Sequence, residues 1–150
     1  MTMSLSEQLN EAMKAAMKAR DSLRLNAIRM IRTAIKNREI DERHELDDQA
    51  VIGVLSTLVK QRKESAQVYR EGGRPELAEK EEQELAIIQE FLPAQLGELE
   101  LRAIIEAAVS ETGATSPKDM GKVMKVVTGK TLGRADGRLV SELVKARLSA

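Results

Sequence analysis

The sequence predicts an all-α fold, because it is built mainly from strong helix formers and almost lacks the aromatic residues that sheets favour. Aromatic residues make up 1% of the chain, and Tyr69 and Phe91 are the two present. Ala, Leu, Glu, Lys, Arg and Met favour helices. With 42% hydrophobic and 32% charged residues, the chain is expected to be globular. Its 150 residues suffice for one core or for two small subdomains.

Capping residues mark where the first helices begin. Ser4 and Glu7 have the spacing of a capping box, so a helix is predicted to start after Ser4. Asp21 is expected to cap the second helix, whose apolar residues recur at helical spacing. The polar stretch Glu39 to Asp48 is predicted to form a loop.

The third helix is predicted over residues 49–71, where the pair Gly72–Gly73 ends it. Pro75 has the first-turn position of a fourth helix, which is expected to end at residues 91–93, Phe-Leu-Pro. Its acidic cluster, with Glu79, Glu81, Glu82 and Glu84, is interpreted as a solvated face.

Residues 93–97 are the predicted boundary between two subdomains, an N-terminal helical bundle over residues 1–92 and a small C-terminal helical domain over residues 93–150. A fifth helix is expected near residues 98–111. Ser116, with Pro at the next position and Asp119 at the third, is expected to open the sixth. Asp136 is expected to cap the last. The sequence therefore predicts about seven helices.

The chain offers little for catalysis. It has no Cys and a single His, His44, in a charged stretch that suggests plain surface. No phosphate-binding Gly-rich motif is present. We therefore expect no catalytic residue, no metal site, no cofactor and no enzymatic activity of the chain alone. The start from Met1 to Ser4 is not typical of a signal peptide, and no stretch resembles a membrane span. A cytoplasmic location is expected, and the absence of Cys is compatible with it.

Charge is distributed unevenly, although the formal net charge of the whole chain is zero. From Gly113 to Ala150 there are 8 Lys and Arg against 3 Asp and Glu. Lys118, Lys122 and Lys125 follow the i, i+4, i+7 spacing of one helix face. Arg134 and Arg138 flank a predicted helix N-terminus, where amide groups attract anions. Plain capping and ion pairing are the structural alternatives for this region.

A second basic stripe is predicted on the second helix, formed by Arg24, Arg29, Arg32 and Lys36. No acidic residue lies between Ser22 and Arg38, so neighbours on the same helix cannot neutralise it. A partner could bind there, or acids from other helices and solvent could satisfy the charges.

Two motifs carry a resemblance to a known family. The DMGKVM sequence at residues 119–124 and the GRADG sequence at 133–137 resemble the signature of the GatB/YqeY family. Shorter matches to the stand-alone YqeY-like proteins extend along the chain, at residues 34–36, 60–62, 73–78 and 91–96. The chain departs from the family pattern at Lys125, where Gly is frequent, at Gly129, where Pro is frequent, and at Gly97, where Ser or Thr often caps.

The resemblance implies a role in tRNA metabolism. The C-terminal domain is similar to the tail domain of the tRNA-dependent amidotransferase B subunit, a carbon–nitrogen ligase with glutamine as amido-N-donor, and that tail is implied to contact tRNA. The catalytic sites of that enzyme have no counterpart here, so a ligase label would be inherited from the shared domain. We therefore expect binding to the tRNA backbone, or to an amidotransferase-type partner. The alternative is a helical protein–protein interaction module with no RNA contact.

Overall fold

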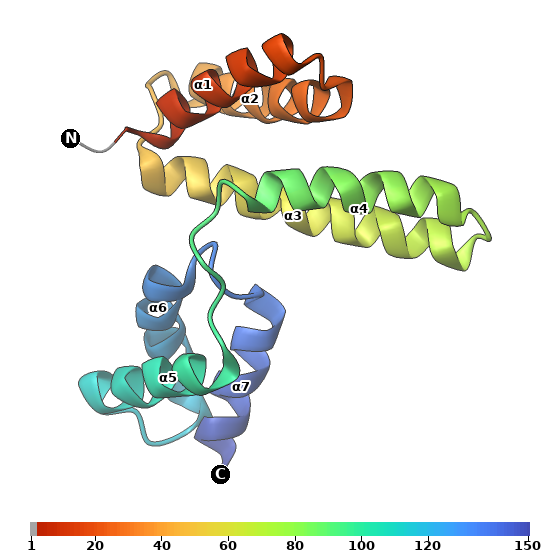
Figure 1. The fold of residues 1–150 in the computed structure, drawn as a ribbon. Coiled ribbons are helices and arrows are strands. Elements are labelled where there is room, and N and C mark those ends of the chain that lie inside the picture. Colours follow the sequence, from red (N-terminus) through yellow and green to blue (C-terminus); the bar gives the residue numbers. More distant parts are fainter. Residues whose placement is uncertain (1–2) are drawn as a thin grey trace. The chain divides into compact units, whose positions relative to one another are not determined.

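The computed structural model describes residues 3–150, and within them it contains seven α-helices, one 3-10 turn and no strand (Figure 1). The all-α prediction is confirmed. Met1 and Thr2, which belong to the start used to argue against a signal peptide, lie outside the described residues. The elements are α1 (Leu5–Ala19), α2 (Ser22–Glu42), α3 (Asp48–Glu71), α4 (Pro75–Gln89), α5 (Glu98–Thr112), the 3-10 turn η1 (Pro117–Asp119), α6 (Met120–Thr131) and α7 (Gly137–Ser149).

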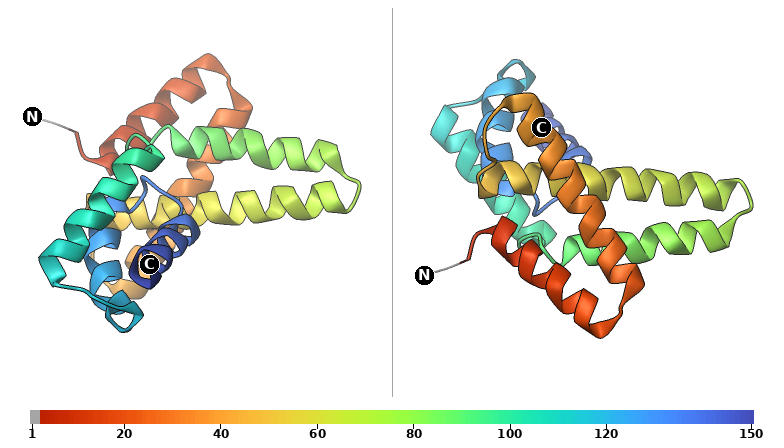
Figure 2. Two further views of the ribbon diagram at one scale, coloured as in Figure 1. Left: turned by 90° about the horizontal axis from the view of Figure 1, so that it is seen from below. Right: turned by 90° about the horizontal axis from the view of Figure 1, so that it is seen from above.

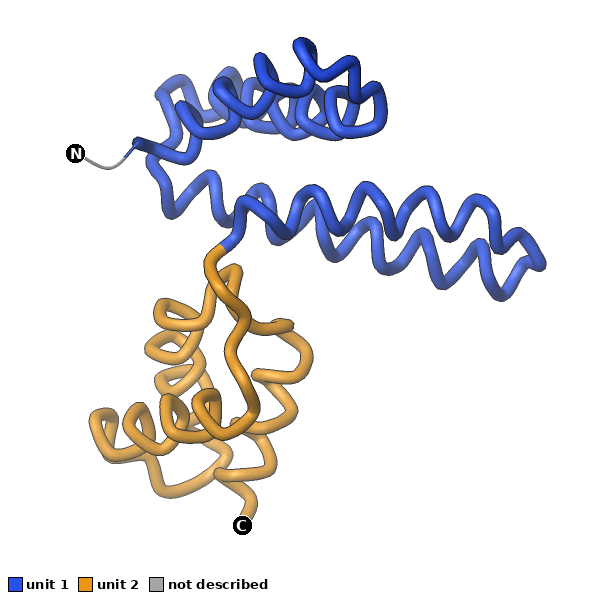
Figure 3. Tube along the Cα trace, in the orientation of Figure 1, with its two compact units in different colours: residues 1–92 blue, residues 93–150 orange. Residues whose placement is uncertain are grey.

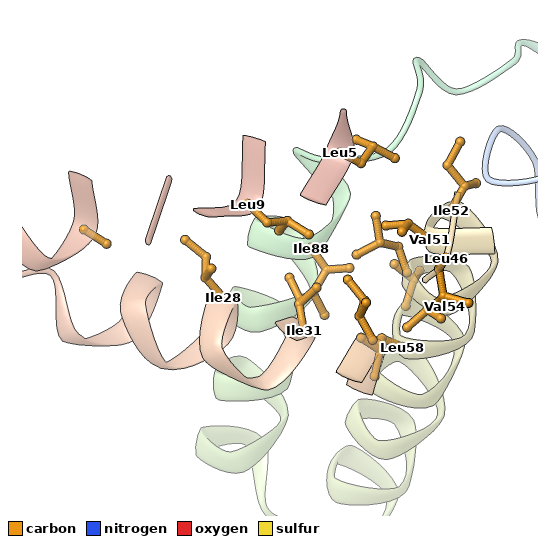
Figure 4. Close-up of a cluster of buried hydrophobic side chains, with 14 residues drawn as sticks. Leu5, Leu9, Ile28, Ile31, Leu46, Val51, Ile52, Val54, Leu58 and Ile88 are labelled. Carbon is orange, nitrogen blue, oxygen red and sulfur yellow. The ribbon is translucent and has the colours of Figure 1, made fainter. Parts of the chain in front are cut away.

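The chain divides into two compact units, Met1–Leu92 and Pro93–Ala150, and each has its own hydrophobic core (Figure 3). In the first unit α3 and α4 lie side by side along their length, while α1 packs on α2 (Figure 2). All four helices contribute to the core of this unit, around the fully buried Ile28, Ile31, Val51 and Ile88 (Figure 4).

The predicted loop over residues 39–48 is wrong at its start, because α2 continues to Glu42. Arg38 Nε donates to Glu42 Oε2 at 2.7 Å, an i, i+4 pair that supports this last turn. The helix ends at Arg43, whose φ of 61° is left-handed. Glu39 then accepts the Leu46 N–H, and Leu46 is buried in the core. A hydrogen bond from the backbone to a side chain seven residues away and one buried side chain therefore order a segment that is polar in sequence.

The fourth helix ends earlier than predicted, at Gln89. Beyond it the backbone tightens, since Phe91 N–H donates to Ile88 O at 3.1 Å and Leu92 N–H donates to Gln89 O at 3.1 Å. Hydrogen bonds between residues three apart, as in a 3-10 helix, often close the last turn of an α-helix. Phe91 and Leu92 are half-buried against the core of the first unit.

In the second unit, the expected stop signals and caps set the helix ends. Gly113 ends α5 with φ 68°. Ser116 and Asp119 form a reciprocal capping box, and the turn they open is 3-10 before α6 continues as an α-helix. Asp136 caps α7. The core that these helices enclose consists of Leu101, Ile105, Ala108, Val109, Val123, Val127, Val140, Val144 and Leu148.

Candidate nucleic-acid interface

The exposed side of η1 and α6 carries the first group of candidate residues. Val123 and Val127 are fully buried, so the opposite side of α6 faces solvent. Lys122 and Lys125 lie on that side, and Lys118 precedes them in the 3-10 turn, all three exposed. Within residues 3–150, neither Lys118 nor Lys125 lies within 4.0 Å of a carboxylate. Their charges are therefore available to a partner.

Asp119 lies in the same region, but its carboxylate binds backbone amides of the preceding loop. Its Oδ2 accepts the N–H of Thr115 at 2.9 Å and that of Ser116 at 3.4 Å. The hydrogen bond from Thr115 is the main cause that lowers the pKa of the Asp119 carboxyl below its ordinary value, and Ser116 and the charge of Lys122 act in the same direction. Lys122 Nζ lies 4.0 Å from Asp119 Oδ1, so part of the Lys122 charge is offset locally.

Arg134 ties the start of the second unit to the turn between α6 and α7. Its Nε donates to Ala94 O at 3.2 Å, and its backbone oxygen accepts the Leu96 N–H at 2.8 Å. Gln95 adds a bond from its Nε2 to Gly133 O at 2.8 Å. The half-buried Arg134 therefore has a structural role, and one of its donors is already engaged.

At the N-terminus of α7, the amide expected to attract an anion has an internal partner. Asp136 Oδ1 accepts the Arg138 N–H at 2.9 Å. The Arg138 side chain is exposed and, among residues 3–150, has no carboxylate within 4.0 Å. Lys145 is likewise exposed and unpaired, seven residues further along α7, so both occupy one helix face. Sequence reasoning left Lys145 out of the site, although its spacing from Arg138 indicates it.

The other cations of the second unit are paired with acids. Arg102 contacts Glu98 at 2.9 Å, Lys130 contacts Glu111 at 3.9 Å, and Arg147 donates to Glu106. The hydrogen bond from Arg147 to Glu106 raises the pKa of the Arg147 guanidinium above its ordinary value. The unit therefore has two classes of basic residue, a paired class and an unpaired class.

The four residues of the predicted α2 stripe have different environments. Arg24 donates to Glu90, the residue that follows α4, and lies 5.9 Å from the centre of the Phe91 ring, so it belongs to the packing of the first unit. Arg32 donates through Nη1 to the sulfur of Met13 on α1 at 2.9 Å. Arg29 and Lys36 are exposed and have no carboxylate within 4.0 Å in the described part of the chain.

The acidic cluster of α4 is not simply a solvated face. Glu84 and Glu81 approach Arg62 of α3, with Oε2 atoms 2.9 and 3.3 Å from its Nε, and Glu82 pairs with Arg70 at 2.7 Å. The solvated-face prediction is wrong for Glu81 and Glu84, because α4 packs along α3 and brings them onto Arg62, where their side chains are only 21% and 20% exposed. Glu82 stays exposed, as predicted, although it pairs with Arg70.

Residues 3–150 contain no group of three His, Cys, Asp or Glu side chains that could hold a metal ion. His44 lies exposed, with Nδ1 2.8 Å from Glu45 O and Nε2 3.9 Å from Glu42. Across the same residues, none of the helices combines the length and the apolar character that a membrane span requires.

The chain is similar in sequence to one known protein family and to proteins from several fungi that share one name. A family model described as YqeY-like protein matches residues 6–148. "Altered inheritance of mitochondria protein 41, mitochondrial" from Vanderwaltozyma polyspora is 42% identical over 85 residues, which are 56% of this chain and 46% of that protein. The protein of the same name from Lachancea thermotolerans is 33% identical over 145 residues, 93% of this chain and 76% of that protein. The chain thus spans about half the length of the first relative and three quarters of the second.

Proposed function

We propose that this chain, which belongs to the family of YqeY-like proteins, is an accessory protein of tRNA metabolism that binds the tRNA backbone through its second unit. The observation that carries the proposal is a group of exposed cations on η1, α6 and α7 that have no carboxylate partner in the described part of the chain: Lys118, Lys125, Arg138 and Lys145. These cations suit phosphate groups. Lys122 adds a charge that Asp119 partly offsets.

Contacts to backbone and shape fit this surface better than contacts to bases. Single-stranded bases are bound mainly by stacking on aromatic rings, and the second unit contains no aromatic residue. Lysine and arginine side chains on exposed helix faces instead track phosphates, and they release counterions when they bind. We therefore expect affinity that depends strongly on salt and weakly on nucleotide sequence.

The proposal has a second form, in which the second unit binds a tRNA-dependent amidotransferase-type partner. The family motifs at residues 119–124 and 133–137 support this form. The relatives named above are called mitochondrial, a location that belongs to them. For this chain the cytoplasm is our expectation. The absence of an assignable nucleophile–base pair supports a binding role without catalysis. Glutaminase turnover by the purified chain would contradict that part.

Filter binding with bulk tRNA across a series of salt concentrations tests the proposal. A triple variant, Lys118→Gln, Lys125→Gln and Arg138→Gln, removes three unpaired cations. It should reduce the slope of log affinity against log salt by roughly 2 to 3, because each phosphate contact contributes about 0.7 to 0.9. Affinity at low salt should fall with it.

The second unit also offers a matched control. Arg102→Gln, Lys130→Gln and Arg147→Gln change the net charge equally but remove cations already paired with acids. This control should keep most of the affinity and the slope. Equal losses in both triple variants would mean that only net charge matters. Absence of binding at low salt by the folded wild-type chain would refute RNA binding and favour a protein-interaction module.

A further inference from the structure

The solvent side of the α1–α2 pair combines cations that have no carboxylate within 4.0 Å among residues 3–150 with exposed apolar side chains, and we call it the α1–α2 patch. On α2, Arg29, Arg32 and Lys36 follow helical spacing i, i+3, i+7, and Ile40 continues the same face four residues after Lys36. Ile40 is 63% exposed. The buried residues of α2, Ala27, Ile28, Ile31 and Ile35, lie on the other side of the helix.

The contact between Arg32 and Met13 shows which side of α1 borders this stripe. Arg32 Nη1 lies 2.9 Å from Met13 Sδ. Met17 is four residues from Met13 on α1 and therefore lies on the same helix face. It is 51% exposed. The patch thus consists of Arg29, Arg32, Lys36 and Ile40 from α2 and of Met13 and Met17 from α1.

We propose that the α1–α2 patch docks a protein partner through an amphipathic helix with acidic residues beside its apolar stripe. Carboxylates would meet Arg29, Arg32 and Lys36, and guanidinium groups bind carboxylates in two-pronged geometry. The apolar stripe of the partner would cover Met13, Met17 and Ile40. Methionine side chains suit such a role, because they are flexible and adapt to different partner surfaces.

The composition of the patch distinguishes this occupant from RNA. A phosphate backbone would satisfy the cations, yet it would gain nothing from the apolar side chains between and beside them. A half-exposed methionine and an isoleucine 63% exposed at the edge of a cationic stripe are covered favourably only by apolar atoms. This surface lies in the first unit and is independent of the candidate RNA-binding residues.

The experiment uses the full chain and a synthetic helical peptide of about 18 residues, long enough to hold helix in water. Its Glu and Leu residues lie on one face, and a fluorophore reports binding by anisotropy. Two comparison peptides replace Leu by Ala, or Glu by Gln. The parent peptide should bind more tightly than either, since each comparison peptide lacks half of the complementarity. The double variant Arg29→Glu, Lys36→Glu should weaken parent binding at least tenfold.

Lys60→Glu with Lys63→Glu is the matched control, because it makes the same charge change at exposed positions of α3 in the same unit. This control should bind the parent peptide nearly as well as the wild type. Circular dichroism establishes that both variants are folded. Failure of the parent peptide to bind the wild-type chain, or equal weakening in the two double variants, overturns the proposal.

Two other occupants give different results. If tRNA binds the patch, Arg29→Glu with Lys36→Glu will weaken tRNA binding and leave peptide binding unchanged. If a second copy of the chain binds it, sedimentation will show a dimer that the same variant dissociates. Either result overturns the proposal. Loss of tRNA binding only in the second-unit variants would leave the docking proposal intact. The docking proposal can therefore fail separately from the proposed function.

Discussion

Two glycines show how a single backbone angle decides whether a side chain is tolerated. Gly53 lies within α3 and Gly113 follows α5, and a Cβ added at either would meet no atom within 4 Å. They differ in backbone conformation. Gly113 has φ 68°, which L-residues adopt at a cost, whereas Gly53 has an ordinary helical backbone. The lack of a neighbour at Gly53 leaves only the entropic cost of glycine in a helix.

We therefore predict opposite effects of the same substitution. Gly53→Ala should raise the free energy of unfolding of the first unit by about 0.5 to 1 kcal/mol. Gly113→Ala should lower that of the second unit by about 1 to 2 kcal/mol. Amide hydrogen exchange measures the two units separately. Stabilisation by both, or by neither, would contradict the assignment of these conformations.

At the scale of elements, a cluster of charges joins α3 to α4. Arg62 contacts both Glu84 and Glu81, and the three side chains are only 18%, 20% and 21% exposed. Arg62 also contacts the sulfur of Met30 on α2. A second link, between Arg70 and Glu82, is about half exposed. Solvent screens the second pair far more than the first, so the two should differ in energetic weight.

Arg62→Ala should destabilise the first unit by about 1 to 3 kcal/mol, because it leaves two poorly solvated carboxylates without a counter-charge. Arg70→Ala, the control at an exposed pair, should cost about 0 to 1 kcal/mol. Adding Glu81→Gln and Glu84→Gln to the Arg62 variant should recover part of the loss. Urea denaturation measures all three. An equal cost for Arg62→Ala and Arg70→Ala would mean that burial adds nothing to the cluster.

Local chemistry explains which parts of the structure were predictable. Ser4, Asp21 and Asp136 accept hydrogen bonds from amides two or three residues away, so their sequence neighbourhood suffices to assign helix starts. Arg20 and Arg43 end helices in left-handed conformations without being glycine, and no local pattern marks them. The number of helices was predictable because capping residues of the first kind mark where the helices begin.

Contacts between residues that are distant in sequence could not be predicted from local patterns. Arg62 and Glu84 are 22 residues apart and Arg24 and Glu90 are 66 apart, so neither pair has a spacing that a helix face would reveal. The same packing separates the candidate site residues into paired and unpaired classes. Sequence reasoning identified the basic positions, whereas which of them keep a free charge depends on neighbours from other helices.

At the scale of the whole molecule, two hydrophobic cores that share no residue divide the chain. The nine buried residues of the second core all come from α5, α6 and α7. The segment before α5 is held within the same unit, because Leu96 N–H and Gln95 Nε2 donate to Arg134 O and Gly133 O. Every candidate RNA contact on η1, α6 and α7 also lies in this unit.

A chain consisting of residues 93–150 should therefore fold alone and bind tRNA. We expect a helical circular dichroism spectrum with one cooperative thermal transition, at low stability because so short a chain buries little surface. Its salt slope for bulk tRNA should equal that of the full chain within about 1. A markedly steeper slope in the full chain would mean that cations of the first unit, such as Arg29 and Lys36, also contact RNA. That result would tie the α1–α2 patch to the nucleic acid and not to a protein, whereas equal slopes would leave the acidic helix as its partner.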